Sequence, residues 1–504
     1  MVIAEKVRWH FVTRLIAGLL VVVGAEFILP GDRTVVKAQT QDSTRAESVE
    51  VGTDSAQDYT RDRFNTDLVS VSTFRPGYTF WQNVFMIPDG HIIFGSAEDG
   101  RLLATFPTRS NWSRSGLWED VELEDTLAGE RLSSNLRRKR ERVVELLEPA
   151  VGSLIHNPTR GRFLLPNAER YGAFLEEWGR IYNRFGVPAQ IGLAQAILES
   201  GLNGRARSRA GALGLCQWLR RNWSFLNRLD PNVIEAYNQT TQASYCAAHL
   251  TILSTMYGSF IPALSEHHAG GVNVGRVVMN GERLGGSNTR EQYLLGAQFA
   301  RDLRQINLRR YRLLYRTYGL RSFLYTEMVF GNTVNVDRLI RETEQEKVFA
   351  MRAERDLYLR DIVNTTGLTV DEVKRFNPAL VRKVPKNANL YLPWYVPEFG
   401  QDVSFWHQPA SGEFLEVLNE FVRLDSADWR WYDRSFVSIL ESFQDRFLNT
   451  DTEEGTVMST TLAYIISNLR SSRRGAILEE YRSSDSVLKL FDRGVNALEA
   501  ASDN

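Results

Sequence analysis

The sequence predicts a mainly α protein with several domains. Its 504 residues are 43% hydrophobic, which is enough for two to four separate cores. Apolar residues recur at helical spacing over about 150 residues from Ala168 onward. Strand-like patterns with strong turn signals are confined to a short N-terminal stretch and to residues 345–397. We therefore expect a helical main domain, a small N-terminal β meander, a β-α-α-β unit and a helical C-terminal region.

Composition excludes one broad class of partner. The chain has 60 basic and 61 acidic residues and a formal net charge of -1. Nucleic-acid-binding domains are usually strongly basic, so no nucleic acid is expected as a partner. Aromatic residues make up 11% of the chain, which suits sugar stacking and ordinary cores equally well.

The N-terminal segment has the organisation of an export signal. Basic residues precede the apolar run Leu15–Ala25, which is too short to span a bilayer, and Val36-Lys37-Ala38 is a small-x-small cleavage candidate. We predict a signal peptide over residues 1–38 and export to the periplasm or cell envelope. The alternative is an uncleaved anchor running on to Leu29, which would give membrane association through the N-terminus. Residues 39–72 are polar and are predicted to be a disordered linker.

A β-rich accessory region is expected over residues 73–130. The runs 83–87 and 91–94 flank Pro88-Asp89-Gly90, a strong hairpin turn. A second turn leads into 102–106, so the pattern predicts a three-stranded meander with an accessory packing role.

The helical domain is predicted to occupy residues 131–325, and one of its helices ends in an unusual way. The helix over 188–200 has a broad apolar face, closes with Glu199, and is followed by Gly201, which can take a left-handed conformation. A carboxyl at the end of so apolar a helix is a candidate for partial burial, which raises its pKa. The alternative is a solvated last-turn residue. The helices predicted from Ala168 onward cover 168–185, 188–200, 217–228, 232–258, 259–267 and 289–318.

The motif E-S-G-x-N at Glu199, a serine nine residues later and a G-L-x-Q sequence ending at Gln217 together resemble a known family. It is the lytic transglycosylase (SLT) domain of the goose-type lysozyme superfamily, in particular that of the membrane-bound murein transglycosylases. The resemblance extends from about Tyr171 to about Arg304 and implies a lysozyme-like fold. It also implies cleavage of the MurNAc-β-1,4-GlcNAc bond of peptidoglycan glycan strands, with Glu199 as acid and then base, a 1,6-anhydroMurNAc product, and no cofactor or metal.

The same resemblance implies a set of substrate-binding residues. Ser208 matches a serine that hydrogen-bonds sugar, and Gln217 matches a glutamine that lines the groove. Where the family has A-Y-N-A-G, this chain reads E-H-H-A-G, so His267 and His268 stand at the tyrosine and asparagine positions. Tyr293 matches a tyrosine that ends the cleft near the acid. Without the resemblance, Ser208 would be interpreted as a turn residue and Gln217 as the first residue of a helix.

Two further features are left open by the sequence. Cys216 and Cys246, the two cysteines of the chain, either form one disulfide in an exported protein or are two small buried hydrophobes. Residues 345–397 resemble a LysM domain in their second half, where Thr369 and Glu372 form a capping-box sequence, whereas the first half departs from the family pattern. A helical C-terminal region over 410–504 carries no chemical motif.

Two alternative functions remain beside the transglycosylase. A muramidase would use the same fold and acid but admit water. A cell-wall-binding scaffold with a decayed site is suggested by His267 and His268 in place of tyrosine and asparagine. The expected partner in each case is the peptidoglycan glycan strand, and protein partners stay undetermined.

Overall fold

The computed structural model confirms the prediction of a mainly α fold. It describes residues 53–229, 239–307, 309–316, 319–377, 380–386, 388–396, 410–424, 430–449 and 452–502. The predicted signal peptide and the first part of the predicted linker lie outside these residues. Within the described ranges, no helix is both long enough and apolar enough to cross a membrane.

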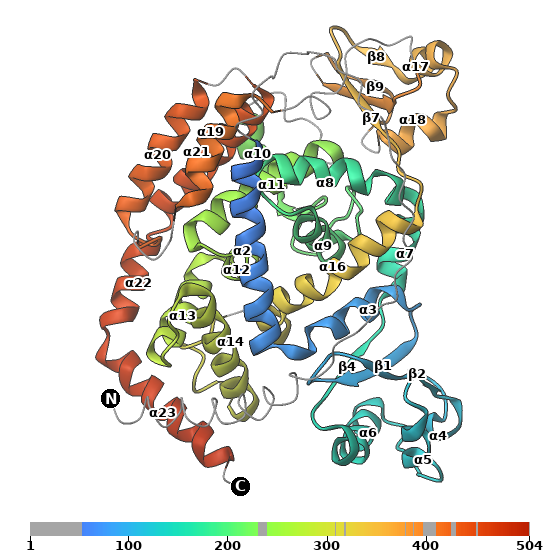
Figure 1. The fold of residues 1–504 in the computed structure, drawn as a ribbon, viewed down its shortest axis with the longest axis vertical. Coiled ribbons are helices and arrows are strands. Elements are labelled where there is room, and N and C mark those ends of the chain that lie inside the picture. Colours follow the sequence, from blue (N-terminus) through green and yellow to red (C-terminus); the bar gives the residue numbers. More distant parts are fainter. Residues whose placement is uncertain are drawn as a thin grey trace, which may run out of the picture.

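A helical body forms the centre of the molecule. Figure 1 shows α9 in its middle, and α8, α11 and α16 pack directly against that helix. A single large hydrophobic cluster runs through the body. Its helices are α2 (Thr53–Phe74), α7 (Gly161–Tyr171), α8 (Leu175–Arg184), α9 (Ala189–Ser200), α10 (Arg220–Leu229), α11 (Gln239–Tyr257), α12 (Phe260–Ala269), α13 (Gly271–Arg283), α14 (Thr289–Ile306), α15 (Leu320–Phe323) and α16 (Tyr325–Glu342).

The body contains helices that the sequence did not predict. The helix expected over 168–185 is two helices, α7 and α8, separated by the 3-10 turn Gly172–Phe174. Neither α13 nor α16 was predicted. Helix α16 buries polar residues such as Asn332 and Asn335 along with its apolar ones.

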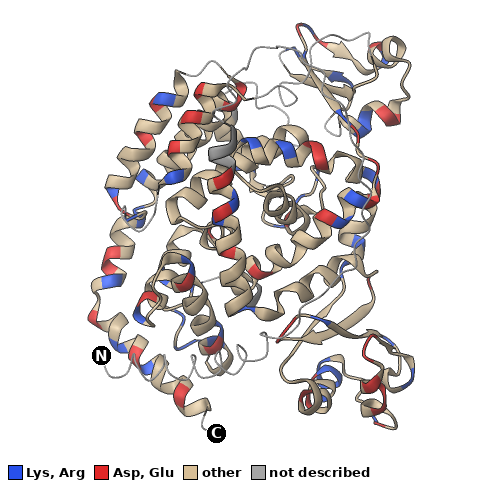
Figure 2. Ribbon diagram, in the orientation of Figure 1, with Lys and Arg blue, Asp and Glu red and all other residues tan. Residues whose placement is uncertain are grey.

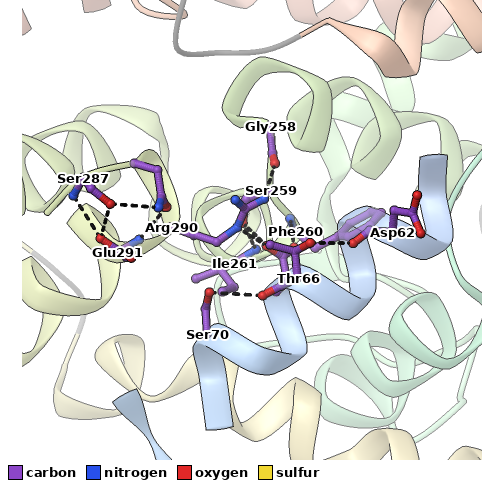
Figure 3. Close-up of polar contacts among 12 residues, drawn as sticks. Asp62, Thr66, Ser70, Gly258, Ser259, Phe260, Ile261, Ser287, Arg290 and Glu291 are labelled. Carbon is purple, nitrogen blue, oxygen red and sulfur yellow. Dashed lines mark hydrogen bonds and ion pairs between the residues drawn. The ribbon is translucent and has the colours of Figure 1, made fainter. Parts of the chain in front are cut away.

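The prediction of a disordered linker over residues 39–72 is wrong for residues 53–72, which belong to α2. This helix is held by the buried carboxylate of Asp67, which accepts hydrogen bonds from Ser259 Oγ at 2.7 Å, Phe260 N at 2.6 Å and Arg290 Nε at 2.8 Å. Figure 3 shows Ser259, Phe260 and Arg290 facing α2. Long-range polar contacts of this kind leave no local sequence pattern, so a polar composition alone suggested disorder.

The N-terminal sheet is larger than the predicted meander. It contains two of the three predicted strands, β1 (His91–Ser96) and β2 (Leu102–Pro107), and two that were not predicted, β3 and β4. Its order is β3-β2-β1-β4, and all its paired strands are antiparallel. The strand predicted over 83–87 is wrong, because residues 83–86 belong to helix α3, whose Val84 and Phe85 are buried. A short apolar run fits a strand and a buried helix equally well. The elements are η1 (Pro76–Trp81), α3 (Gln82–Met86), β1 (His91–Ser96), β2 (Leu102–Pro107), α4 (Trp112–Ser115), β3 (Leu117–Trp118), α5 (Glu124–Leu127), α6 (Leu136–Val151) and β4 (Leu154–Pro158).

The sheet also changes a predicted domain boundary. Strand β4 pairs with β1 along its whole length, and α6 shares the hydrophobic cluster under the sheet. The sheet unit therefore continues to Pro158, and the predicted border at residue 131 between accessory region and helical domain falls inside it. The structure also extends the helical body beyond residue 325, because α16 packs on α9.

Residues 348–393 contain the two helices and the two outer strands of the predicted β-α-α-β unit, with a short inner strand pair, β8 and β9, that was not predicted. We call this part the βααβ module. Its outer strands pair antiparallel, and a separate hydrophobic cluster fills it. The capping box is confirmed, with Thr369 Oγ1 accepting from Glu372 N at 3.2 Å and Glu372 Oε2 accepting from Thr369 N at 2.7 Å. The elements are β7 (Val348–Arg352), β8 (Leu357–Tyr358), α17 (Leu359–Thr366), α18 (Val370–Phe376), β9 (Lys383–Val384) and β10 (Asn389–Pro393).

The C-terminal region is helical, as predicted, and wraps around the body. Helix α19 packs on α2, α21 on α11, α22 on α13 and α23 on α14. Acidic and basic residues are interspersed along these outer helices (Figure 2). The buried Arg474 Nη1 donates to Glu266 Oε1 at 2.8 Å, which ties α22 to the end of α12. The helices are α19 (Gly412–Arg423), α20 (Arg434–Leu448), α21 (Glu453–Ser471), α22 (Arg474–Ser483) and α23 (Asp485–Ser502).

Candidate active site

Glu199 lies in the last turn of α9, and the two residues that follow it, Ser200 and Gly201, fix the end of this helix. Gly201 is confirmed as the left-handed C-terminal residue, with φ of 60°. A Cβ there would approach Phe163 O to 2.1 Å, so any side chain would also clash. Ser200 Oγ donates to Ala196 O at 3.0 Å and to Leu215 O at 2.9 Å. The E-S-G motif thus ends the helix and attaches it to the following loop.

The Glu199 carboxyl faces a half-closed cavity of about 150 Å³. Its side chain is 14% exposed, which makes it neither solvated nor fully enclosed. The walls come from five parts of the chain that are far apart in sequence. Glu199 is the single carboxylate among the described residues that line the cavity. The lining residues are Trp81, Val84, Phe85, Asn157, Arg160, Leu198, Glu199, His268, Tyr325 and Met328.

Burial raises the pKa of Glu199 from 4.5 to about 7. The Tyr325 hydroxyl donates a hydrogen bond to Oε1 at 2.6 Å, which favours the carboxylate and opposes part of this increase. Burial also raises the pKa of Tyr325 well above 10, so its hydroxyl keeps its proton and stays a donor. A carboxyl with a pKa of about 7 is half protonated near neutral pH, which lets one group give and take a proton.

His268 is the predicted substrate-binding residue that the structure places beside the acid. Its ring stacks on Tyr325, with centroids 4.5 Å apart and planes 10° apart. Its Nδ1 lies 3.9 Å from Glu199 Oε1. Burial lowers the pKa of His268 below its usual 6.5, so the ring is neutral at neutral pH and does not drive the proton off Glu199.

One wall of the cavity comes from the region that the sequence assigned only a packing role. Trp81 Nε1 donates to Glu327 Oε1 at 3.0 Å, and Arg75 Nε lies 3.2 Å from Glu327 Oε2. This buried ion pair fixes the tryptophan to α16, the helix that also carries Tyr325. Arg160 N donates to Val84 O at 2.6 Å and joins the end of the sheet to α3. None of these wall residues was predicted to take part in the site.

Ser208, Gln217 and His267 lie in or against the loop after Glu199 and do not line the cavity. Ser208 Oγ accepts from Ala212 N at 3.0 Å. Gln217 has a left-handed φ of 53°, rare for a residue with a side chain, and its Nε2 donates to Ala206 O at 3.1 Å and Gly214 O at 2.9 Å. These bonds hold the loop in shape. A direct contact of either residue with sugar stays a prediction.

His267 points the other way from His268. Its Nε2 donates to Cys216 O at 2.7 Å, and burial lowers its pKa to about 4, so it is neutral and acts as a fixed donor. It therefore links the end of α12 to the loop. The described residues contain no group of three His, Cys, Asp or Glu side chains that could hold a metal ion.

The expectation that Tyr293 ends the cleft near the acid is not met by the structure. Tyr293 is 3% exposed, and its hydroxyl accepts a hydrogen bond from Ser265 in the protein interior. The tyrosine that contacts the acid is Tyr325, at the start of α16. Sequence spacing could not find it, because the contact depends on how α16 crosses α9.

The question of the two cysteines is answered by the geometry. Cys216 and Cys246 form a disulfide across a sequence separation of 30. The bond joins the loop after Glu199 to α11. The side chain of Gln242, also in α11, donates to Gly204 O at 3.1 Å and accepts from Leu215 N, so the loop is held twice by the same helix.

A helical body that presents one protonatable carboxyl to a half-closed cavity belongs to the lysozyme-like class. Residues 176–289 match the family model described as the transglycosylase SLT domain. No curated protein matches the chain. The chain therefore contains a lysozyme-like transglycosylase domain, of the kind that acts on peptidoglycan. Glu199 lies inside the matched range, whereas Trp81 and Tyr325 lie outside it.

Proposed function

We propose that the protein is an exported peptidoglycan lytic transglycosylase in which Glu199 is the acid and then the base. The observation that carries the proposal is that one carboxyl, with a pKa of about 7, stands alone among the residues lining the cavity. Glycosidases that use water or a protein nucleophile normally have a second carboxylate facing the scissile bond. A site with one carboxyl favours a reaction in which the substrate supplies its own nucleophile.

Glu199 alone is sufficient for both proton transfers of the proposed reaction. Protonated Glu199 gives its proton to the oxygen between MurNAc and GlcNAc, and the bond from MurNAc C1 to that oxygen breaks. The N-acetyl oxygen of the substrate stabilises the positive charge at C1. The Glu199 carboxylate then removes the proton of the C6 hydroxyl, and this oxygen bonds to C1 to close the 1,6-anhydro ring. Glu199 is left protonated, ready for the next cycle.

The neighbours of Glu199 each have a part in this proposal. The Tyr325 hydroxyl occupies Oε1, which leaves Oε2 to carry the proton. The apolar wall formed by Trp81, Phe85 and Met328 keeps water away, which maintains the raised pKa and disfavours hydrolysis. His268, held flat against Tyr325, is placed to hydrogen-bond substrate as a neutral ring. The βααβ module would hold glycan if its resemblance to LysM domains extends to binding.

The test uses purified sacculi and mass spectrometry of the released muropeptides. Glu199→Gln is expected to fold and to abolish release, while the exposed Glu169→Gln serves as the matched control with unchanged release. The wild-type product should lack one water relative to a reducing muropeptide. Reducing products would establish the muramidase alternative instead. Unchanged release by Glu199→Gln would remove Glu199 from the mechanism.

The activity should depend on pH in a way that identifies both groups. Activity is expected to fall above about pH 7, as Glu199 loses the proton it must donate. It is expected to fall at acid pH when His268 becomes charged, and its lowered pKa places this limb below the usual range for histidine. The initial rate measured against pH should therefore be bell-shaped. A His268→Asn variant with the same acid limb as the wild type would show that His268 is not the group responsible.

A further inference from the structure

A second cavity, of about 210 Å³, lies where the βααβ module meets the helical body. We call it the junction pocket. Three of its lining residues are cations from three different parts of the chain: Arg170 at the end of α7, Arg205 in the loop after Glu199, and Lys374 in α18. Its other lining residues are Tyr171, Leu380 and Val381.

The junction pocket has defined walls, because the module is docked on the body through specific contacts. Arg375 Nε donates to Arg170 O at 3.2 Å, and Arg375 Nη2 lies 2.9 Å from Glu346 Oε1. The rings of Phe174 and Phe376 pack with centroids 5.0 Å apart. Arg170 and Lys374 are therefore brought together by an interface that combines apolar, ionic and hydrogen-bonded contacts.

The three cations are distinguished from their neighbours by the absence of carboxylate partners. Arg375, next to Lys374, is paired with Glu346, and Arg180 on the next helix is paired with Glu176. Within the described part of the chain, no acidic side chain lies within ion-pair distance of Arg170, Arg205 or Lys374. Like charges that converge on one cavity repel each other, and a bound anion relieves that repulsion. Guanidinium and ammonium groups are both suited to carboxylate.

Residues at the two ends of α7 line the junction pocket and the cavity that Glu199 lines. Arg160, just before the helix, belongs to the first cavity, and Arg170, near its end, belongs to the junction pocket. Ten residues of helix correspond to about 15 Å. In Figure 1, α7 lies at the edge of the body, with α3 below it and α18 above it. An extended peptide of about five residues reaches up to about 17 Å, which is enough to bridge this distance.

We propose that the junction pocket binds the carboxylates of the peptide stems that MurNAc carries in peptidoglycan. The inference rests on the proposed function, since it assumes that a MurNAc residue is bound beside Glu199. The stem leaves that sugar, follows α7 and places its acidic groups among Arg170, Arg205 and Lys374. The junction pocket then selects glycan that still carries peptide and adds to substrate binding without taking part in the chemistry.

The test compares two substrates that differ only in their stems. Soluble glycan strands released from sacculi are used intact, or after an amidase has removed their peptides. The double variant Arg205→Gln/Lys374→Gln removes two of the cations, neither of which has an ion pair that folding would lose. Lys489→Gln, at an exposed position on α23, is the matched control. Thermal melting of each variant checks that folding is unchanged.

On stem-bearing strands, the double variant is expected to lower kcat/KM about threefold to tenfold, mainly through KM, because exposed ion pairs contribute modestly. On stripped strands it should equal the wild type, and added salt should reduce the difference on stem-bearing strands. Equal kinetics on both substrates, or an equal loss on both, would overturn the inference while leaving the proposed function intact. Failure of the wild type to release anhydro products from either strand would overturn the proposed function, and this inference with it.

Discussion

The raised pKa of Glu199 makes a prediction about stability that is independent of any substrate. Folding moves this pKa from 4.5 to about 7, so the folded protein holds the proton more tightly than the unfolded chain does. The stabilisation from holding this proton is complete below about pH 4.5 and is lost as the pH rises to about 7. Above that range the folded protein must keep a partly buried charge. Glu199→Gln removes that charge while keeping an oxygen that can accept from Tyr325.

The expected difference in unfolding free energy follows from the shift in the pKa of Glu199. About two and a half pH units, at 1.36 kcal/mol for each, correspond to about 3 kcal/mol. Glu199→Gln should therefore gain up to about 3 kcal/mol of stability relative to the wild type between about pH 4 and about pH 8. The 14% exposure of the side chain makes this an upper value, since water screens part of the cost.

The assay is urea unfolding of both proteins, followed by tryptophan fluorescence at several pH values. The quantity compared is the difference in unfolding free energy between variant and wild type, plotted against pH. It should rise through the range from about pH 4.5 to about pH 7 and then level off. The Glu169→Gln variant, at an exposed position, is measured in parallel as the control for the substitution itself. A flat line for Glu199→Gln would refute the argument that burial holds this carboxyl protonated, and with it the physical basis of the proposed mechanism.

Three further predictions concern the surroundings of the acid. Tyr325→Phe removes the donor to Glu199 and should lower kcat roughly tenfold while moving the alkaline limb of the pH profile upward, measured on glycan strands; an unchanged profile would exclude the contact. Asp67→Ala leaves a buried pairing site empty and should lower the unfolding free energy by about 3 to 5 kcal/mol, measured by urea titration; a loss below about 1 kcal/mol would mean that α2 is held by other contacts. Cys246→Ser, which frees Cys216, should cost about 3 to 4 kcal/mol for a closed loop of 30 residues; equal stability of variant and wild type, with and without reductant, would contradict the bond.

Features that are determined by a few neighbouring residues could be predicted from the sequence. The end of α9 at Ser200 and the left-handed Gly201 were both predicted, because an apolar helix followed by Ser-Gly is a local signal. The capping box at Thr369 and Glu372 was predicted for the same reason. In each case a short stretch of chain determines its own conformation, whatever packs around it.

Features that depend on packing between distant elements could not be predicted. Tyr325 reaches Glu199 only because α16 crosses α9, and α16 itself was not predicted. Helix α2 looked like a polar linker because the hydrogen-bond partners of its buried Asp67 lie 192 and 223 residues further along the chain. Trp81 looked like an accessory residue because its partner, Glu327, lies on a helix that was not recognised. The position of Glu199 at a helix end was therefore predicted from the sequence, whereas most walls of its cavity were not.

The cavity around Glu199 is assembled from both sides of the range that matches the SLT family model. Trp81 and Phe85 precede residues 176–289 and Tyr325 follows them. A fragment cut at those borders would retain the acid and lose its enclosure, so Glu199 would titrate as an ordinary surface carboxyl and could no longer donate a proton near neutral pH. By the same reasoning, separating α3 from α7 would open the cavity to water and lower the pKa of Glu199. Turnover would then fall without any change at Glu199 itself.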